Sequence, residues 1–299
     1  LEAELRKMGK KTLWIGPSLG DWLAMGKGIA WQAMHNNPVS NAFIVHDLKV
    51  ISETAERLGK REDAARYRRQ LAATTDAYIK KFVSKNGIVA KDYQAAYIMA
   101  LKFVLPEGEL REMVKNNFVS NIRITGLQTG FFATEHLLPL LVEAGEQKLA
   151  YDVLLQENCP GWMYQVKCGA TTTWERWDAL KPDGTVNEEK MAGSGENMVS
   201  FNHYAFGSVG EFYYQYILGI RPEKPGFAKL HFAPYPDERL GGVSGSYLSV
   251  AGKIESAWRY EPDGCHIRLA TPVEAVVLLP DGRSENVPAG TYEWTVKRP

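Results

Sequence analysis

Apolar residues recur at the spacing of a helix face through the first half of the chain. Between residues 40 and 59, Phe43, Leu48, Val50 and Ile51 approximate this spacing, and a Ser or Asn can cap the start. The pattern continues in five further segments, at 61–84, 92–104, 107–120, 129–144 and 146–156. Because helix follows helix with no strand between them, we predict an all-α layer of successive hairpins that form a toroid.

Other segments of the first 221 residues depart from the hairpin pattern. Residues 157–199 are poor helix material and predict a long loop, which we interpret as a pocket wall. Residues 201–218 are apolar and aromatic almost all round, which predicts a buried helix. At the other end, residues 1–12 predict a polar helical tail, and Gly and Pro predict a loop over residues 13–24.

The last part of the chain has the pattern of a β domain. After Pro222, short apolar runs typical of strands alternate with Pro-Asp-Gly or Pro-Ala-Gly turns about every ten residues. The predicted strands are 228–232, 250–260, 266–269 and 275–279, with 244–249 leading into the sheet. We therefore predict a β-sandwich over residues 222–299, following a helical domain over residues 1–221.

Composition narrows the classes of function. Lys and Arg number 35 and Asp and Glu also number 35, so no basic field indicates nucleic acid or an anionic membrane. No run of about 18 apolar residues predicts a membrane span. The cysteines Cys159, Cys168 and Cys265 form no Cys-x-x-Cys pair, and no metal-ligand cluster is visible. We expect no disulfide framework, metal or cofactor.

The segment Gly169-Ala-Thr-Thr-Thr-Trp-Glu-Arg-Trp-Asp178 combines aromatic and charged residues. In it Glu175 lies between Trp174 and Trp177. Indole faces can cover the apolar face of a pyranose while charged groups bind its hydroxyls, so this composition suits a sugar site. An ordinary half-buried loop with a surface ion pair contains the same residue types, and the segment alone does not decide between the two.

A second block follows, Ser200-Phe-Asn-His-Tyr-Ala-Phe-Gly-Ser-Val-Gly-Glu-Phe-Tyr-Tyr-Gln-Tyr-Ile-Leu-Gly-Ile220. At this separation the two blocks resemble the C-terminal half of bacterial α-L-rhamnosidases, inverting enzymes of glycoside hydrolase family 78. The resemblance rests on a Thr-x-Trp-Glu-x-Trp segment and an Asn-His-Tyr-Ala-x-Gly-x-Val-Gly-Glu segment. It implies the second half of an (α/α)6 barrel followed by a C-terminal β-sandwich, and removal of terminal α-L-rhamnose from oligosaccharides or other glycosides.

The same resemblance implies roles for particular residues. Glu175 matches the general base, and His203 matches a histidine that contacts the sugar. By itself, a histidine on an apolar helix is more often a satisfied core residue. A Gly-Asp-Trp-Leu element of the family also matches the loop at residues 20–23. The further residues expected to bind hydroxyls or pack on the ring are Asp21, Trp22, Trp174 and Trp177.

The sequence departs from the family in its general acid. The family carries this acid in an Asp-x-x-x-Arg-Asp-Glu-Arg-x-Gly-Trp-x-Gly-Asp segment, which is absent here. The nearest fragment, Lys60-Arg-Glu-Asp-Ala64, begins a polar helix and lacks the Gly-Trp pair. The sequence also begins with Leu1 rather than Met. We therefore expect part of a longer enzyme that hydrolyses rhamnosides poorly or not at all by itself.

Two other interpretations stay open. Another toroidal glycosidase, such as a glucuronyl hydrolase or a fucosidase-type relative, would cleave a different glycoside. A non-catalytic scaffold or sugar-binding remnant would bind sugar whether or not Glu175 is replaced. The sequence also leaves open which rhamnoside is cleaved, whether the chain forms a homodimer, and whether it works in the cytoplasm, which its few unpaired cysteines slightly favour, or is secreted.

Overall fold

The computed structural model describes residues 12–26, 28, 31, 34, 35, 37–190 and 198–298. They form two compact units, which divide between Gly207 and Ser208. The helical tail predicted for residues 1–12 lies outside the described residues apart from Thr12, and so does the part of the predicted pocket wall at 191–197.

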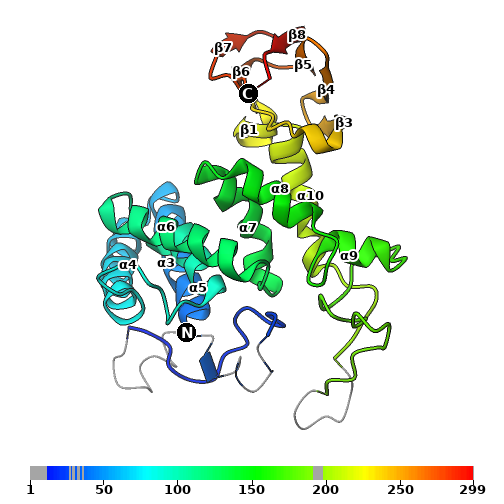
Figure 1. Ribbon diagram of the computed structural model, residues 1–299. Coiled ribbons are helices and arrows are strands. Elements are labelled where there is room, and N and C mark those ends of the chain that lie inside the picture. Colours follow the sequence, from blue (N-terminus) through cyan, green and yellow to red (C-terminus); the bar gives the residue numbers. More distant parts are fainter. Residues whose placement is uncertain are drawn as a thin grey trace. The chain divides into compact units, whose positions relative to one another are not determined.

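The first unit is helical, as the hydrophobic pattern predicts. Two long helices, α3 (Asn37–Arg57) and α4 (Arg61–Phe82), pack as a hairpin through a tight link at Gly59, whose φ of 71° favours glycine (Figure 1). The helices that follow are α5 (Gln94–Met99), its π-helical continuation η1 (Ala100–Val104), α6 (Glu109–Thr125), α7 (Phe131–Glu143), α8 (Gln147–Leu155) and α9 (Trp162–Lys167). The six segments predicted as helices are therefore confirmed, with shifted ends.

Helix α5 lies at the centre of this unit. All six of its residues are buried, and it packs against α3, α6 and α7. Its first residue, Gln94, donates from Nε2 to Asn121 Oδ1 (3.1 Å) and to the carbonyl of Gly126 (2.9 Å). Its Oε1 accepts from the backbone N–H of Gln128 at 2.9 Å. These buried bonds hold the link between α6 and α7, and thereby set where α7 begins.

The start of α7 is capped by a residue that lies far away in the sequence. The first N–H groups of a helix have no partner within the helix, and an acidic side chain can satisfy them. Here the fully buried carboxylate of Asp21 accepts from Gly130 (2.7 Å), Phe132 (2.9 Å) and Ala133 (2.8 Å). The loop predicted over residues 13–24 is thus fastened to α7.

The same junction depends on a close approach between two backbones. Phe131 donates its N–H to the carbonyl of Trp22 at 2.9 Å. A Cβ atom on Gly130 would lie 2.1 Å from that carbonyl oxygen and 2.7 Å from the carbonyl oxygen of Asp21. Backbone atoms cannot move aside as a side-chain end can, so only glycine allows this approach.

Residues 157–218, between the helices and the strands, differ from the sequence prediction in two respects. Residues 157–190 are loop-rich but include helix α9, which the sequence did not indicate. The helix predicted at 201–218 is confirmed in part: it begins later and is buried on one side only. Residues up to Tyr204 are non-helical, and η2 (Ala205–Ser208), α10 (Val209–Phe212) and η3 (Tyr213–Ile217) then follow without a break. Phe206, Phe212 and Tyr216 are buried, whereas Tyr213 and Tyr214 are exposed. Tyr204 is 87% exposed because the preceding residues pair with another segment instead of continuing a helix.

The second unit contains two four-stranded sheets, ordered β1-β2-β6-β7 and β3-β4-β5-β8. The second sheet is antiparallel throughout, whereas β2 and β6 pair in parallel in the first. Figure 1 shows these strands in yellow to red. Their bounds are β1 (Ile220–Lys224), β2 (Lys229–Phe232), β3 (Gly242–Ser249), β4 (Gly252–Glu261), β5 (Gly264–Thr271), β6 (Ala275–Leu278), β7 (Ser284–Val287) and β8 (Gly290–Val296).

The predicted β domain is therefore confirmed, although β1, β7 and β8 were not predicted. Strands β1 and β7 are mostly exposed and polar, so no alternation of apolar residues marks them. Between the sheets, the ring of Trp294 stacks on Phe232 with centroids 6.1 Å apart. The indole of Trp258 is buried and donates to the carbonyl of Ile217 at 2.7 Å, which satisfies its only polar atom.

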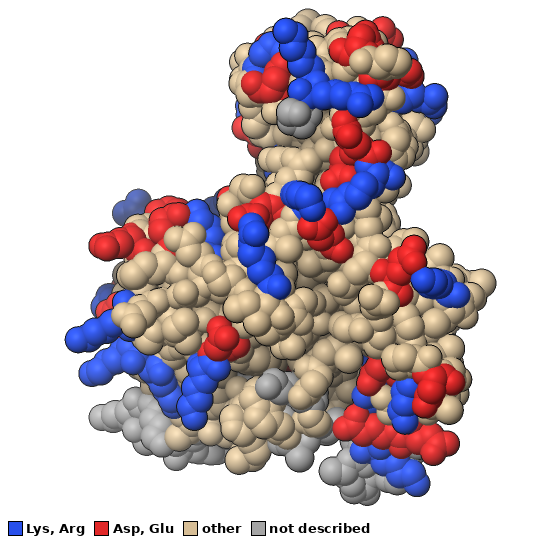
Figure 2. Space-filling view, in the orientation of Figure 1, with Lys and Arg blue, Asp and Glu red and all other residues tan. Residues whose placement is uncertain are grey.

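The surface and the helices agree with the composition. Positive and negative side chains are interspersed over the face that Figure 2 shows. Among the described residues, no helix combines the length and the apolar character that a membrane crossing requires.

We predict that Gly130→Ala destabilises the helical unit by about 1–3 kcal/mol, since the added methyl group must displace backbone. The matched control is Gly207→Ala, where the new Cβ would make an ordinary 3.5 Å contact with the side chain of Thr173. Urea unfolding followed by the helical circular dichroism signal measures both. Equal effects of the two substitutions would contradict the close approach at Gly130.

We also predict a pH-dependent role for Asp21. Burial raises the pKa of its carboxyl group from 3.8 to about 6, although its hydrogen bonds to Ala133, Gly130 and Phe132 act to lower it. Because the folded state then binds the proton more tightly, the stabilisation from this group is full below about pH 4 and is lost as the pH rises through about 6. The difference in unfolding free energy between the wild type and Asp21→Asn should therefore shrink by up to about 3 kcal/mol between those limits. A difference that is constant or grows with pH would contradict this.

Candidate functional site

The block at 169–178 and the first residues of the block at 200–220 are bonded to each other in the helical unit. The backbone N–H of Glu175 donates to the carbonyl of Ser200 at 2.8 Å, and that of His203 donates to the carbonyl of Thr173 at 2.8 Å. The hydroxyl of Thr173 donates in turn to the carbonyl of His203 at 2.6 Å. The two bonds between Thr173 and His203 and the bond between Glu175 and Ser200 hold the two segments in a defined register.

Glu175 differs from its neighbours in exposure and in partners. Trp174, Arg176 and Trp177 are buried, with at most 8% of each residue exposed, whereas Glu175 is half-buried. Among the described residues, none makes a hydrogen bond or an ion pair with the Glu175 carboxylate. The flanking residues therefore anchor the backbone while this carboxylate is left open to an external partner.

Trp177 is anchored deeply in the protein. Its ring stacks on Phe206 with centroids 3.8 Å apart and an interplanar angle of 10°, and it meets Trp162 edge to face at 5.0 Å. Its Nε1 donates to the carbonyl of Thr129 at 2.8 Å, just before α7. In this position the indole holds the Glu175 segment against α7.

Trp174 is also turned into the protein. Its ring contacts Phe201 edge to face at 5.3 Å and Tyr164 at 6.3 Å. Its backbone N–H donates to Gln165 Oε1 at 3.1 Å. The contribution of Trp174 and Trp177 to sugar binding stays a prediction, because both rings pack on protein side chains.

The residues that come after Glu175 in the sequence form an ion-pair network. The guanidinium of Arg176 donates from Nε to Asp178 at 2.7 Å and from Nη2 to Glu189 at 2.8 Å. Asn187 donates to the second oxygen of Asp178 at 2.9 Å. Arg176 therefore neutralises two carboxylates near Glu175 without pairing with Glu175 itself, and it ties residues 178–189 to the site.

His203 is held in a definite orientation. It is half-buried, and its ring lies 4.7 Å from that of Phe131 and 5.2 Å from that of Tyr204. The backbone N–H of Ala205 donates to Nδ1 at 3.2 Å. A neutral ring that accepts at Nδ1 carries its proton on Nε2, so this nitrogen can donate to a ligand hydroxyl.

The loop at residues 20–23 is bonded to the start of α7, which also contacts Trp177 and His203. Both carboxylate oxygens of Asp21 are engaged by α7, and none of the residue is exposed. Trp22 is half-buried, and Leu23 after it has a φ of 58°, a conformation that costs a non-glycine residue about 1–3 kcal/mol. Sugar contact by Asp21 or Trp22 stays a prediction. Residues 129–133 thus contact this loop, Trp177 and His203.

Sequence reasoning missed several residues of this region. Thr173 was only part of a motif, yet it bonds to His203 twice. Phe131 and Phe206 looked like core residues, and their contacts with His203 and Trp177 depend on packing that no local pattern shows. Within the part of the chain that the structure describes, no three His, Cys, Asp or Glu side chains gather as metal ligands would.

Comparison with known proteins assigns both units. The family model described as bacterial alpha-L-rhamnosidase 6 hairpin glycosidase domain matches residues 3–217. The model of the bacterial alpha-L-rhamnosidase C-terminal domain matches residues 219–292.

Individual relatives agree with these two models. An alpha-L-rhamnosidase of Alteromonas sp. (strain LOR) is 34% identical over 265 residues, 85% of this chain and 28% of that protein. The structure of the Streptomyces avermitilis alpha-L-rhamnosidase complexed with L-rhamnose aligns with a TM-score of 0.87 at 29% identity, covering 99% of this chain and 30% of that one. For the Aspergillus terreus enzyme the TM-score is 0.83 at 30% identity, with coverage of 93% and 33%.

The chain therefore spans about a third or less of each of these relatives. Within that span, the helical region matches the first model, and the region with two sheets matches the second. On the match of the first model to most of the sequence, this chain belongs to the bacterial α-L-rhamnosidase family.

Proposed function

We propose that this chain is the part of an inverting α-L-rhamnosidase that carries the general base, Glu175. The observation that supports this most directly is the contrast between Glu175 and its surroundings. Its neighbours Trp174, Arg176 and Trp177 are buried and bonded, whereas its carboxylate is half-buried and has no partner among the described residues. A carboxylate held in this way can accept a proton from a water molecule without first breaking an ion pair.

The neighbouring residues have complementary roles in this proposal. His203 donates from Nε2 to a sugar hydroxyl, and the half-buried Trp22 packs against the ring. Direct contact by Asp21, Trp174 or Trp177 would require these buried side chains to become accessible. We propose that they act mainly by position, with Asp21 holding the loop of Trp22 and the two tryptophans holding the segment of Glu175.

Inversion requires a second carboxyl group about 6.5–9.5 Å from the base, which protonates the leaving oxygen while the base activates water on the opposite face. The family segment that supplies this acid does not occur in these 299 residues. Full activity on terminal α-L-rhamnosides therefore depends, in this proposal, on a form of the protein that includes that segment.

Replacement of the base tests the proposal. Glu175→Gln keeps the shape of the side chain but cannot take a proton, so kcat on 4-nitrophenyl α-L-rhamnoside should fall by about 10²–10⁴-fold. The measurement uses this chain and a longer form that carries the upstream acid segment. Binding of L-rhamnose, measured by calorimetry, should change little, since the base acts on water rather than holding the sugar.

The controls separate the competing functions. Glu189→Gln, which removes one partner of Arg176, should retain most of the turnover. Turnover of a glucuronide or a fucoside instead of the rhamnoside would indicate another glycosidase. Rhamnose binding with no turnover in either form would indicate a non-catalytic remnant, and undiminished turnover in Glu175→Gln would exclude Glu175 as the base.

The bond between Thr173 and His203 generates a second prediction. Thr173→Val removes the hydroxyl that donates to the carbonyl of His203, whereas Thr173→Ser retains it. Because a misplaced His203 weakens a sugar hydrogen bond, KM should rise about tenfold in the valine variant and stay near the wild-type value in the serine variant. If the two variants behave alike, the hydroxyl does not position His203.

A further inference from the structure

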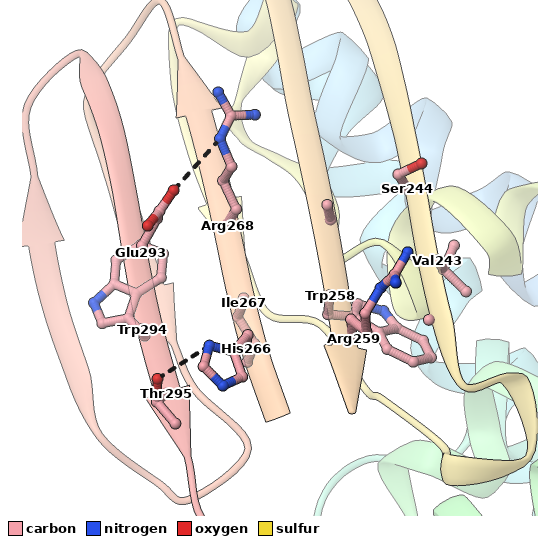
Figure 3. A pocket seen from close by; sticks show the side chains of 12 residues that line it. Val243, Ser244, Trp258, Arg259, His266, Ile267, Arg268, Glu293, Trp294 and Thr295 are labelled. Atoms are coloured by element: carbon pink, nitrogen blue, oxygen red, sulfur yellow. Dashed lines mark hydrogen bonds and ion pairs between the residues drawn. The ribbon is translucent and has the colours of Figure 1, made fainter. Parts of the chain in front are cut away.

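The second unit has a hollow of about 430 Å³ on the outer face of the sheet β3-β4-β5-β8. Figure 3 shows the four strands that contribute side chains to it. The strand register places these residues in two rows, Gly242–Arg259–His266–Thr295 and Ser244–Ala257–Arg268–Glu293. Since side chains alternate between the faces of a sheet, the intervening Trp258 and Ile267 point to the buried side and are at most 2% exposed.

The shape of the hollow follows from residue size. Three positions in the rows are small, Gly242, Ser244 and Ala257, next to the long side chains of Arg259 and Arg268. A Cβ at Gly242 would lie 3.2 Å from the Cβ of Arg259 and 3.3 Å from its Cγ, so the stem of this arginine lies close over the glycine. This face of the sheet therefore carries little side-chain bulk along β3 and at Ala257, beside the two arginines.

Both guanidinium groups have hydrogen-bond donors to spare. Arg259 is exposed and makes no hydrogen bond or ion pair with the residues that the structure describes. Arg268 forms two ion pairs, from Nη1 to Glu255 at 3.6 Å and from Nε to Glu293 at 3.9 Å. Glu255 itself pairs with Lys253 at 2.6 Å, which lowers the pKa of its carboxyl group. Arg268 therefore has two carboxylate partners, and its Nη2 makes no hydrogen bond with the residues that the structure describes.

The register also sets the spacing of the two arginines. Arg259 is opposite His266 and Arg268 is opposite Ala257, so the arginines are diagonal neighbours on adjacent antiparallel strands. The Cβ atoms of such neighbours are about 7–8 Å apart, and long side chains can converge across that distance. Figure 3 shows the two guanidinium groups apart, so a single oxyanion contacts both only when the side chains turn toward each other. Each fork can then bind it through two parallel hydrogen bonds.

The remaining lining residues suit hydroxyl groups. Glu293 offers carboxylate acceptors, and the hydroxyls of Ser244 and Thr295 can both donate and accept. His266 is held by Asp263 at 2.8 Å and by the hydroxyl of Thr295 at 3.5 Å. Cations beside acceptors for hydroxyls fit a sugar that carries an acid group. A polyanion such as nucleic acid would require a wider basic field than a lining with two arginines, one histidine and one glutamate provides.

We propose that this hollow is an accessory binding site for an acidic saccharide, whose carboxylate or sulfate group is held between Arg259 and Arg268. The site lies wholly on the β unit. It binds one sugar unit of a larger glycan, and the glycosidic bond that is cleaved lies elsewhere on that glycan. It does not depend on the assignment of Glu175, so either proposal can fail without the other.

The test is titration of this chain, observed by amide NMR shifts and by calorimetry. The probes are trigalacturonate, a sulfated galactan disaccharide, neutral maltotriose and inorganic sulfate. We expect one or both acidic saccharides to bind at least about tenfold more tightly than maltotriose and than sulfate alone, with shifts at β3, β4, β5 and β8 and weakening by added salt. The stronger of the two identifies the acid group.

Variants locate the site. Arg259→Gln and Arg268→Gln should each weaken acidic-saccharide binding about tenfold, and the double variant should abolish it. Lys229→Gln, which removes one positive charge from the other sheet, should leave the affinity unchanged. Both arginines are exposed, and unchanged thermal unfolding would confirm that the variants fold. Equal binding of maltotriose, equal binding of sulfate alone, or equal weakening by Lys229→Gln would overturn the proposal.

Discussion

The carboxylate of Asp21 at the start of α7 is the interaction on which the rest of the site depends. The backbone N–H groups of Gly130, Phe132 and Ala133, at the start of α7, would otherwise lack this partner, which would cost about 1–3 kcal/mol for each one that is buried. Burial of the acid carries its own cost, visible in its raised pKa of about 6. The hydrogen bonds between the carboxylate and these N–H groups reduce both costs, and they exist only while the loop and α7 stay together.

The candidate site extends outward from this junction. Thr129 and Phe131 at the start of α7 contact Trp177 and His203, which belong to the two separate sequence blocks. The blocks are joined directly by hydrogen bonds on both sides of Thr173. Rigid aromatic packing and backbone bonds therefore support one half-buried carboxylate, so the residues that position the segment differ from the proposed general base.

The two units place their functional groups in different ways. In the helical unit, side chains from loops and helix starts converge because each is buried against α7 or its neighbours. In the β unit, the pleat and register of four strands place Arg259 and Arg268 on one face, and small residues leave room between them.

Much of this could be predicted from the sequence. Helical spacing is a local property of about ten residues, so the six main helical segments of the first unit were predicted, and turns at regular intervals predicted the β domain. The motif around Glu175 marked the candidate base, and the family comparisons agree with its resemblance. Strands β1 and β7 were not predicted because they are exposed and polar, and their residues show no apolar alternation.

Tertiary structure decided what depends on contacts between distant residues. The sequence by itself determined the helical and β classes, the family resemblance and the identity of the candidate residues. It predicted one buried helix over 201–218, whereas the backbone bond between His203 and Thr173 accompanies a non-helical start, and the helical turns begin only at Ala205. Likewise, burial of Asp21, Trp174 and Trp177 follows from partners that lie up to 112 positions away, and no local pattern records them.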